Sequence, residues 1–308
     1  MTATARWGRA LPLSYGEDRP MGQSRAFASV LWFAAILLAW IGGGCQRRAE
    51  YGKVGQYWAR ALQEVYKTPG ELKAQDEREA RKGTVYRKLI HGDRSVRAIA
   101  LAFDDGPHPQ YTPKLLAILQ REQVQATFLV VGKMAEQYPD LIRQESAAGH
   151  LIGNHTYHHV NLTRIPLNLV ETEWQACNEV IESILGLAMA YCRPPGGDYD
   201  ADVITAAAKA GLTTVLWTDD PADYARPGDR LIERRVLDAI SPGGIVLLHD
   251  GVQQTVDVLP QIIETLKQRG RQFQTIDEMA RDTLGPPQRQ QPASPAPLSH
   301  RGGVTRTP

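Results

Sequence analysis

Residues 96–107 have the sequence VRAIALAFDDGP, and the organisation of the rest of the chain follows from this stretch. It is apolar up to Phe103 except at Arg97, which is typical of a strand buried within a sheet. Two adjacent carboxylates, Asp104 and Asp105, come next, and a Gly-Pro pair then stops the strand. Two like charges at the end of a buried strand are unfavourable unless a metal ion, an arginine or a proton compensates them. The remaining sequence must therefore supply such partners.

The composition is that of an ordinary globular protein. Of 308 residues, 43% are hydrophobic and 22% are charged, which suits one large domain with extensions. The formal net charge of +1 gives no reason to expect nucleic acid as a partner. The three cysteines, Cys45, Cys177 and Cys192, are too few for a disulfide framework and form no CxxC pair. Cys177 and Cys192 are either a disulfide, if the chain is exported, or two buried thiols.

The N-terminal part carries a candidate targeting segment. Residues 26–44 contain no charge, and this length fits the core of a signal peptide or a minimal membrane span. Translation from Met21 would leave a short basic region before this run, the usual form of an export signal. The run ends in IGGGC at 41–45, which resembles a bacterial lipoprotein processing site with Cys45 as the lipidated residue. We expect residues 1–45 to place the protein in the bacterial cell envelope, outside the cytoplasm, as a lipoprotein, a membrane-anchored protein or a secreted one.

The rest of the chain divides into three parts by composition. Residues 46–83 are polar and helix-prone, and they are predicted to be a spacer. Residues 84–283 alternate short apolar stretches with amphipathic ones, as expected of the folded domain. Residues 284–308 are rich in Pro, Gln, Ser and Arg without apolar periodicity, which predicts a disordered tail.

Strands and helices are predicted to alternate along the domain. The strands are expected at 96–103, 126–131, 150–153, 188–192, 213–217, 245–248 and 272–276. Helices are expected after them, from 112 and at 135–148, 166–185, 201–210, 229–240, 255–269 and up to 280. Connections of this length suit parallel crossovers, so the class is α/β with a parallel sheet, either an open doubly wound sheet or a barrel. No glycine-rich phosphate loop follows the first strand, which argues against nucleotide binding.

Reactive side chains follow the predicted strands, all on the same side of the repeat. They are Asp104, Asp105, His155, His159, Arg193, Asp220, Asp223 and His249. In a parallel barrel these positions share the rim at the carboxyl ends of the strands, where active sites are built. Residues far apart in the sequence are therefore expected to meet at one mouth.

His155 and His159 lie four residues apart in the stretch HTYHH. In a helical turn this spacing puts both imidazoles on one face, suitable for one metal ion, whereas His158 points elsewhere. Joined to a carboxylate, they make a two-histidine, one-carboxylate site with an open position for water. One of Asp104 and Asp105 would then bind the metal while the other stays free beside it. The alternative is a solvated, histidine-rich loop beside a pair of surface acids.

Arg193 and His249 are candidates for supporting roles. Arg193 begins the stretch RPPGG, where a permanent cation can hold a carboxylate in its ionised form, unless the stretch is only a turn. Its glycines let backbone N–H groups approach a substrate oxygen. His249 ends an apolar strand, and an acid such as Asp223 nearby would raise its pKa and favour the protonated, proton-donating form.

Taken together, these motifs resemble the polysaccharide deacetylase family, the NodB-type carbohydrate esterases of family 4. The resemblance spans roughly residues 96–281 and rests on FDDGP at 103–107, HTYHH at 155–159, RPPGG at 193–197, the stretch 217–224 and LLH at 247–249. It implies a distorted (β/α)7–8 barrel and a divalent metal ion, usually Zn²⁺, with Co²⁺ or another ion as alternatives. It also implies a monomer that removes N-acetyl groups from an amino-sugar polymer. Envelope location favours peptidoglycan N-acetylglucosamine as substrate, followed by chitin-like glycans.

The resemblance further implies a role for each site residue. The metal ligands would be Asp105, His155 and His159. The catalytic set would be Asp104 as general base, His249 as general acid, Arg193 orienting the base and Asp223 tuning the acid. The substrate pocket would include Pro195, Gly196, Trp217, Tyr224 and Leu247.

The sequence departs from the family pattern near the pocket. Gly196 stands where the family commonly has Tyr, and Tyr224 replaces a frequent Trp, so an altered substrate fit is expected. Two alternative functions stay open, an O-acetyl esterase of the xylan type on the same fold and a non-catalytic glycan-binding envelope module. A glycosidase fits less well, because adjacent Asp104 and Asp105 are poorly placed to flank a glycosidic bond.

Overall fold

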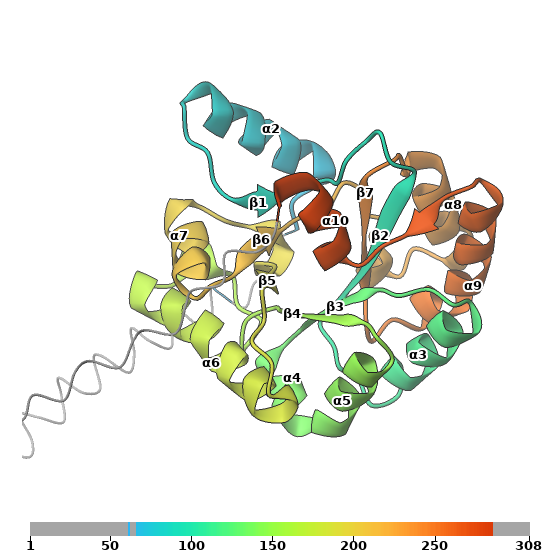
Figure 1. Ribbon diagram of the computed structural model, residues 1–308, viewed down its shortest axis with the longest axis horizontal. Coiled ribbons are helices and arrows are strands. Elements are labelled where there is room, and N and C mark those ends of the chain that lie inside the picture. The colour runs from blue at the N-terminus through green and yellow to red at the C-terminus, as the bar shows by residue number, and fades with distance from the viewer. Residues whose placement is uncertain (1–60, 62–65, 286–308) are drawn as a thin grey trace, which may run out of the picture. The chain divides into compact units, whose positions relative to one another are not determined.

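A parallel sheet forms the centre of the computed structural model, which describes residue 61 and residues 66–285 (Figure 1). Its strands are β1 (Lys88–Leu89), β2 (Ala98–Asp104), β3 (Thr127–Val130), β4 (Leu151–Asn154), β5 (Tyr191–Cys192), β6 (Thr213–Val215), β7 (Gly244–His249) and β8 (Gln272–Phe273). The order across the sheet is β1-β6-β5-β4-β3-β2-β7, with β8 also paired to β2, and every pairing is parallel. The predicted α/β class with a parallel sheet is therefore confirmed.

The sheet curls until its two ends approach each other. Beyond β6, Asp219 forms an isolated parallel bridge with Val246 of β7. After β1, the N–H of Gly92 donates to the carbonyl of Gly243, just before β7, at 2.7 Å. The result is a curled, incomplete barrel surrounded by helices, rather than an open doubly wound sheet (Figure 1). This curvature brings the carboxyl ends of the strands to a common rim.

Helices connect the strands on the outside of the sheet. They are α2 (Pro69–Arg81), α3 (Thr112–Arg121), α4 (Gly132–Gln137), α5 (Pro139–Ala147), α6 (Leu167–Leu185), α7 (Ala201–Lys209), α8 (Asp229–Ala239), α9 (Gln253–Gln268) and α10 (Ile276–Leu284). Short 3₁₀ turns are η1 (Leu162–Arg164), η2 (Pro195–Gly197) and η3 (Asp223–Ala225). Local chemistry sets several helix ends, as at Gly186, whose left-handed conformation (φ 67°) ends α6.

Two local predictions were wrong. The helix expected at 135–148 is two helices, because Pro139 keeps Tyr138 out of the helical conformation (φ −128°, ψ 57°). Strand β1 was not predicted, because it is only two residues long and includes a lysine. Lys88 is nevertheless buried, since its ammonium group pairs with Asp76 at 2.8 Å and also with Glu79.

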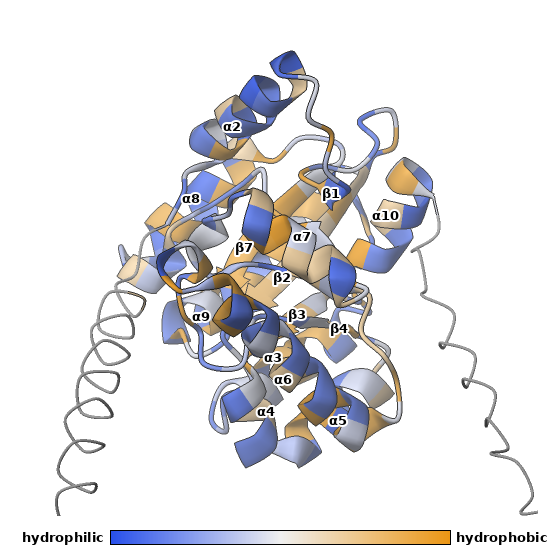
Figure 2. Ribbon diagram, turned by 90° about the vertical axis from the view of Figure 1, so that its left-hand side faces the viewer, coloured by the Kyte–Doolittle hydropathy of each residue, from blue (hydrophilic) through white to orange (hydrophobic). Residues whose placement is uncertain are grey.

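The sheet is buried on both faces, as its apolar strands predict. Along β2, Ala100 and Ala102 belong to one buried cluster, whereas Ile99, Leu101 and Phe103 belong to the other. This alternation is the two-residue period of a strand. Figure 2 shows the hydrophobic strands inside and hydrophilic residues on the outer faces of the helices. The small side chains of β2 on one face leave room for the curled sheet to pack against itself.

The structure decides between the two readings of the cysteines. Cys177 and Cys192 are both free and buried, so they are two separate thiols. Burial raises the pKa of the Cys192 thiol to about 12, which keeps it protonated and unreactive.

The predicted targeting segment at 26–44 and Cys45 lie outside the described residues, as do residues 286–308 of the predicted tail. Within the described part of the chain, no helix is long and apolar enough to cross a membrane. The division of the chain at residues 45, 83 and 283 stays a prediction.

Candidate active site

The predicted reactive residues converge at the carboxyl ends of the strands. Asp104 is the last residue of β2 and pairs in register with His249, the last residue of β7. His155 follows β4 directly, and its N–H donates to the carbonyl of Val130 at the end of β3, at 2.9 Å. Arg193 follows β5 and donates its N–H to Asn154 at 2.9 Å. Parallel pairing therefore assembles the site from segments far apart in the sequence.

Three of these residues form a cluster suited to one metal ion. The Oδ1 atom of Asp105 lies 3.4 Å from Nε2 of His155 and 3.1 Å from Nε2 of His159. All three ligand atoms lie within 4.8 Å of one another. We call Asp105, His155 and His159 the triad. It is the kind of site that two histidines and one carboxylate form around a divalent ion with an open position.

A strained loop, not the helical turn that the spacing suggested, brings the two histidines together. Thr156 and His159 both have left-handed backbone conformations, with φ of 67° and 57°. The Thr156 hydroxyl accepts the N–H of His159 at 2.9 Å and so holds the turn. His158 points away and lies 2.8 Å from Glu173, as expected. Asp105 is also left-handed (φ 74°), and such strain is typical of residues held in place for a function.

The atoms of the triad fit a cation. Among the described residues, Oδ1 of Asp105 is buried and accepts no hydrogen bond of good geometry, although Nε2 of both His155 and His159 lies within 3.4 Å of it. Burial opposes the ionisation of Asp105, but the imidazoles of His155 and His159 outweigh it and hold the pKa of this carboxyl well below its usual range. Nδ1 of His155 donates to the carbonyl of Arg193 at 2.8 Å, which leaves Nε2 as the atom directed at Asp105. A carboxylate with an unused buried oxygen and an oriented imidazole are what a divalent ion requires.

A buried arginine holds the carboxylate of Asp104 beside this cluster. Nη1 of Arg193 donates to Oδ1 of Asp104 at 2.6 Å, and Arg193 is completely buried. The remaining guanidinium donors bond to the carbonyls of Val215 (3.2 Å) and Leu216 (3.3 Å), so the cation is fixed. Oδ2 of Asp104 lies 3.6 Å from Nε2 of His155 and therefore faces the triad. One oxygen of Asp104 is held by Arg193 while the other faces the triad.

His249 is held from behind by Asp223. Oδ1 of Asp223 lies 2.7 Å from Nδ1 of His249, and Oδ2 accepts the backbone N–H of His249 at 2.8 Å. The Thr255 hydroxyl also donates a hydrogen bond to Oδ2 of Asp223, at 2.6 Å. Burial lowers the pKa of His249, but Asp223 more than offsets it and raises the pKa to about 9. His249 is therefore protonated near neutral pH, with Nε2 as the atom left for a substrate.

The predicted pocket residues occupy two depths. Trp217 and Leu247 are buried, and Trp217 packs with its ring centroid 5.6 Å from the guanidinium of Arg193. Pro195 is also buried, at the start of η2. Gly196 and Tyr224 are partly exposed at the mouth, and the Tyr224 ring lies edge-on to His249 at 5.2 Å.

Several residues that support the site were not predicted from the sequence. The main ones are Asn154, Thr156, Thr255 and Asp250. Asp250 donates its N–H to the carbonyl of Asp104 at 2.8 Å, and its carboxylate packs so closely on Gly106 that a Cβ there would come within 2.7 Å of Oδ2. Adjacency to His249 in the sequence was the one signal that pointed to Asp250.

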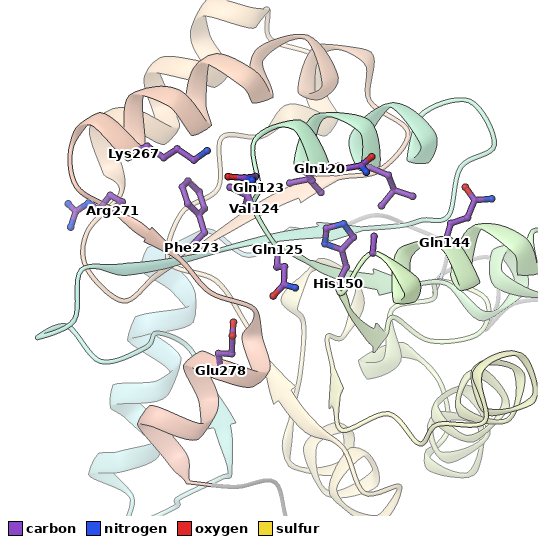
Figure 3. Close-up of a pocket in the computed structure, with 13 residues that line it drawn as sticks. Gln120, Gln123, Val124, Gln125, Gln144, His150, Lys267, Arg271, Phe273 and Glu278 are labelled. Atoms are coloured by element: carbon purple, nitrogen blue, oxygen red, sulfur yellow. The ribbon is translucent and has the colours of Figure 1, made fainter.

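A separate hollow of about 750 Å³ lies at the opposite end of the strands (Figure 3). Gln125 and His150, which line it, precede β3 and β4. Lys267 and Arg271 line its other side, from the end of α9 and the start of β8. This hollow contains no member of the triad, so the predicted chemistry and the hollow are at different ends of the sheet.

Fold and site together define a class of protein. A curled parallel sheet carries a candidate metal triad at its carboxyl end, and an arginine-held carboxylate and a carboxylate-held histidine stand beside it. This is the arrangement of a metal-dependent hydrolase of α/β architecture.

The chain belongs to the polysaccharide deacetylase family. Residues 91–215 match the family described as polysaccharide deacetylase. This range includes Asp104, the triad and Arg193 but ends before His249. The pairing of β2 with β7 is what places His249 in the same site.

Curated relatives have names that agree with this family. The chain is 39% identical over 205 residues to a chitooligosaccharide deacetylase of Bradyrhizobium sp. (strain ANU 289), covering 61% of this chain and 94% of that one. It is 37% identical over 190 residues to a peptidoglycan-N-acetylglucosamine deacetylase of Bacillus cereus, covering 60% and 89%.

Solved structures agree with the fold. A peptidoglycan N-acetylglucosamine deacetylase in complex with a substituted N-oxidanyl-benzamide has a TM-score of 0.64 and 31% identity, covering 68% of this chain and 98% of that one. A family 4 pseudoenzyme from Bacillus anthracis has a TM-score of 0.62 and 26% identity, covering 66% and 72%. Because the fold also occurs in a pseudoenzyme, activity depends on the site residues and not on the fold alone.

Proposed function

We propose that this protein is a metal-dependent hydrolase that removes N-acetyl groups from an amino-sugar polymer. The observation that carries the proposal is the triad flanked by Asp104, held by Arg193, and by His249, held by Asp223. The relatives named as chitooligosaccharide and peptidoglycan deacetylases support the same reaction class. We further propose N-acetylglucosamine units of peptidoglycan or of a chitin-like glycan as the substrate.

In this proposal the triad of Asp105, His155 and His159 holds a divalent ion. Two imidazole nitrogens and one carboxylate oxygen suit Zn²⁺, with Co²⁺ as a substitute. Such an ion, when bound, polarises the amide carbonyl and makes a water molecule more acidic. Asp105 contributes the charge, and the fixed tautomer of His155 contributes a nitrogen already oriented for binding.

Asp104 and His249 would transfer protons on either side of the reacting amide. Asp104 is the base: Arg193 holds its Oδ1, and its Oδ2 faces the triad, where it can accept the proton of the attacking water. His249 is the acid: Asp223 keeps it protonated, and its Nε2 gives a proton to the leaving amine nitrogen. An amide needs this second step because an unprotonated amine is a poor leaving group.

The proposed acetyl site lies over the pocket floor. Trp217 and Leu247 are buried there, and Tyr224 stands at the edge beside His249. Pro195 and Gly196 form the turn on the other side, where backbone N–H groups can approach the developing oxyanion. An apolar floor suits the methyl group of the acetyl and excludes water from it.

The N-terminal segment is part of the proposal as well. An apolar run at 26–44 followed by Cys45 supports anchoring at the outer side of the bacterial cytoplasmic membrane, close to a peptidoglycan substrate. Of the polar stretch at 46–83 that the sequence predicts as a spacer, Ala61 and Leu72 are buried in the core of the catalytic domain, so the residues before Ala61 are the part that would space the domain from the membrane. Labelled fatty acid should enter the protein in cells, and Cys45→Ser should abolish the labelling; equal labelling of both would contradict lipidation.

The function is tested by measuring acetate release from a panel of substrates. The panel contains N-acetylglucosamine oligomers, N-acetylated peptidoglycan and acetylated xylan. We expect release from the first two, loss of release after treatment with a chelator, and recovery on adding Zn²⁺ or Co²⁺. Release from xylan alone would indicate an O-acetyl esterase, and release from no glycan would indicate a binding module without turnover. Full activity after removal of all metal would overturn the metal assignment.

A further inference from the structure

Tyr66, which comes from the segment before α2, lies against the acid side of the active site. Its ring stacks on Tyr224 with centroids 4.0 Å apart and planes 12° apart. The same ring lies edge-on to His249 at 5.9 Å, and Tyr224 is edge-on to His249 at 5.2 Å. The three rings therefore form one cluster, in which two parallel tyrosines stand beside the histidine.

Specific contacts hold this segment at the rim of the site. The N–H of Lys67 donates to the carbonyl of Gly196 at 2.9 Å, which ties the segment to the turn at η2. The ammonium group of Lys67 lies 3.0 Å from Asp198 and donates to Gln75 at 2.6 Å. Both Lys67 and Asp198 are largely shielded, with side-chain exposures of 22% and 20%. A shielded ion pair joined to a backbone hydrogen bond fixes the place of the residue next to it.

Described residues on both sides of Tyr66 in the sequence are anchored as well. On one side, Ala61 is 2% exposed, and its carbonyl accepts the N–H of Asn161 at 2.7 Å. On the other side, α2 starts with a capping box between Thr68 and Glu71, and its Leu72 is fully buried in the domain core. Tyr66 is thus held between two anchored points of the same folded unit.

The two tyrosines are placed where a sugar would lie. Trp217 and Leu247 are buried, whereas Tyr66 and Tyr224 are partly exposed and lie beside His249. His249 must reach the nitrogen that joins the acetyl group to the sugar ring, so that ring has to lie close to His249. Aromatic side chains offer a flat apolar surface with a polar edge, which matches the apolar face and hydroxyl rim of a pyranose.

We infer that Tyr66 is a substrate-binding residue of this active site, supplied by the segment that precedes the catalytic fold. With Tyr224 it forms a two-ring wall that binds the pyranose carrying the acetamido group and sets its nitrogen beside His249. This inference rests on the proposed deacetylase function. In this inference Tyr66 recognises the sugar ring. The acetyl group is bound separately, over Trp217 and Leu247.

Two classes of substrate separate this role from a structural one. Full-length wild type, Tyr66→Ala and Tyr66→Phe are assayed on an N-acetylglucosamine tetramer and on an aryl acetate, which has no sugar ring. We expect Tyr66→Ala to reduce kcat/KM on the tetramer by roughly fivefold to tenfold, mainly through KM, as the loss of one aromatic contact implies. We expect Tyr66→Phe to keep most of the activity and the aryl acetate to be hydrolysed equally by all three. Val85→Ala, which changes a side chain that is 91% exposed just after α2, is the matched control.

The outcomes separate failure of this inference from failure of the proposed function. Wild-type rates for Tyr66→Ala on the tetramer, or equal losses on both substrates, would overturn the role of Tyr66. Absence of acetate release from any glycan by the wild type would overturn the proposed function instead. In that case calorimetric binding of the tetramer tests Tyr66 without turnover: weaker binding by Tyr66→Ala supports the contact, and equal or absent binding overturns it.

Discussion

The burial and charge of ionisable side chains differ between the two ends of the curled sheet. At the carboxyl end, Arg193, Asp104 and His249 are 3% exposed or less, and Arg193 pairs with the carboxylate of Asp104 as His249 does with that of Asp223. At the amino end, the hollow is lined by Lys267, which is 41% exposed. The buried His150 there is neutral, because burial lowers its pKa to about 4. Charge is thus buried at one end and is either exposed or neutralised at the other.

This difference indicates which end carries chemistry. A buried charge is costly, and pairing offsets the cost only when the geometry is good. Buried charged pairs are therefore expected mainly where they have a function. The amino end shows the ordinary solution, in which a buried imidazole loses its proton and a cation stays in water. A set of buried, paired and oppositely charged groups around a triad is what a proton-transfer site requires.

The largest contrast is expected for the two histidines. His249→Ala should reduce kcat for acetate release by about 10²- to 10⁴-fold, because the proposed proton donor to the leaving amine is removed. His150→Ala, at the other end, should leave kcat per folded molecule within about twofold. Bound Zn²⁺, measured by elemental analysis, should be the same in both variants and wild type. Similar losses of turnover in the two variants would remove the distinction between the ends.

The same contrast should appear in stability. Arg193→Met leaves Asp104 as an uncompensated buried charge and should lower the free energy of unfolding by about 3–5 kcal/mol. Lys267→Met breaks a partly exposed pair with Glu122, whose atoms lie 3.5 Å apart, and should cost at most about 1 kcal/mol. Urea unfolding of both variants gives the comparison. Equal costs would mean that the Arg193–Asp104 pair is no more buried in solution than a surface pair.

A smaller effect is expected from Asp223→Asn, in the pH profile. Asp223 raises the pKa of His249 to about 9, so the protonated acid persists below that pH and is lost as the pH rises through it. With Asn in place of Asp, burial still lowers the pKa while its main opposing charge is gone. The alkaline limb of kcat/KM should therefore move to lower pH by more than one unit. A limb that stays in place would show that another group donates the proton.

Much of the fold was predictable because the pattern is local. The apolar run that ends at Asp104 predicted β2, and the alternation of strands and helices predicted a parallel sheet. The clustering of reactive residues after the strands predicted that Arg193 and His249 would meet Asp104, and their contacts show that they do. In a parallel sheet the carboxyl ends of the strands lie at the same edge for any loop conformation. The meeting of these residues could therefore be predicted without knowing the loops.

The remainder depended on contacts that leave no periodic signal. The loop at His155 and His159 reaches its shape through left-handed residues and the Thr156 hydroxyl, which a spacing rule for helices does not describe. Thr255 bonds to Asp223 from α9, and no sequence pattern marks that pairing. Tyr66 lies in a stretch that composition assigns to a spacer, yet its ring stacks on Tyr224. The first is a local backbone conformation, whereas the other two are single side-chain contacts over long sequence separations, which become visible once the sheet has been built.

The central claim is a division of labour between two adjacent carboxylates, in which Asp105 holds the metal and Asp104 moves the proton. It is tested most directly by measuring bound Zn²⁺ and acetate release in the same preparations of Asp104→Asn and Asp105→Asn. Asp104→Asn should retain one Zn²⁺ per chain and lose turnover by about 10²- to 10⁴-fold, whereas Asp105→Asn should lose both. If Asp105→Asn kept its Zn²⁺ and Asp104→Asn lost it, the two roles would be reversed and the account contradicted.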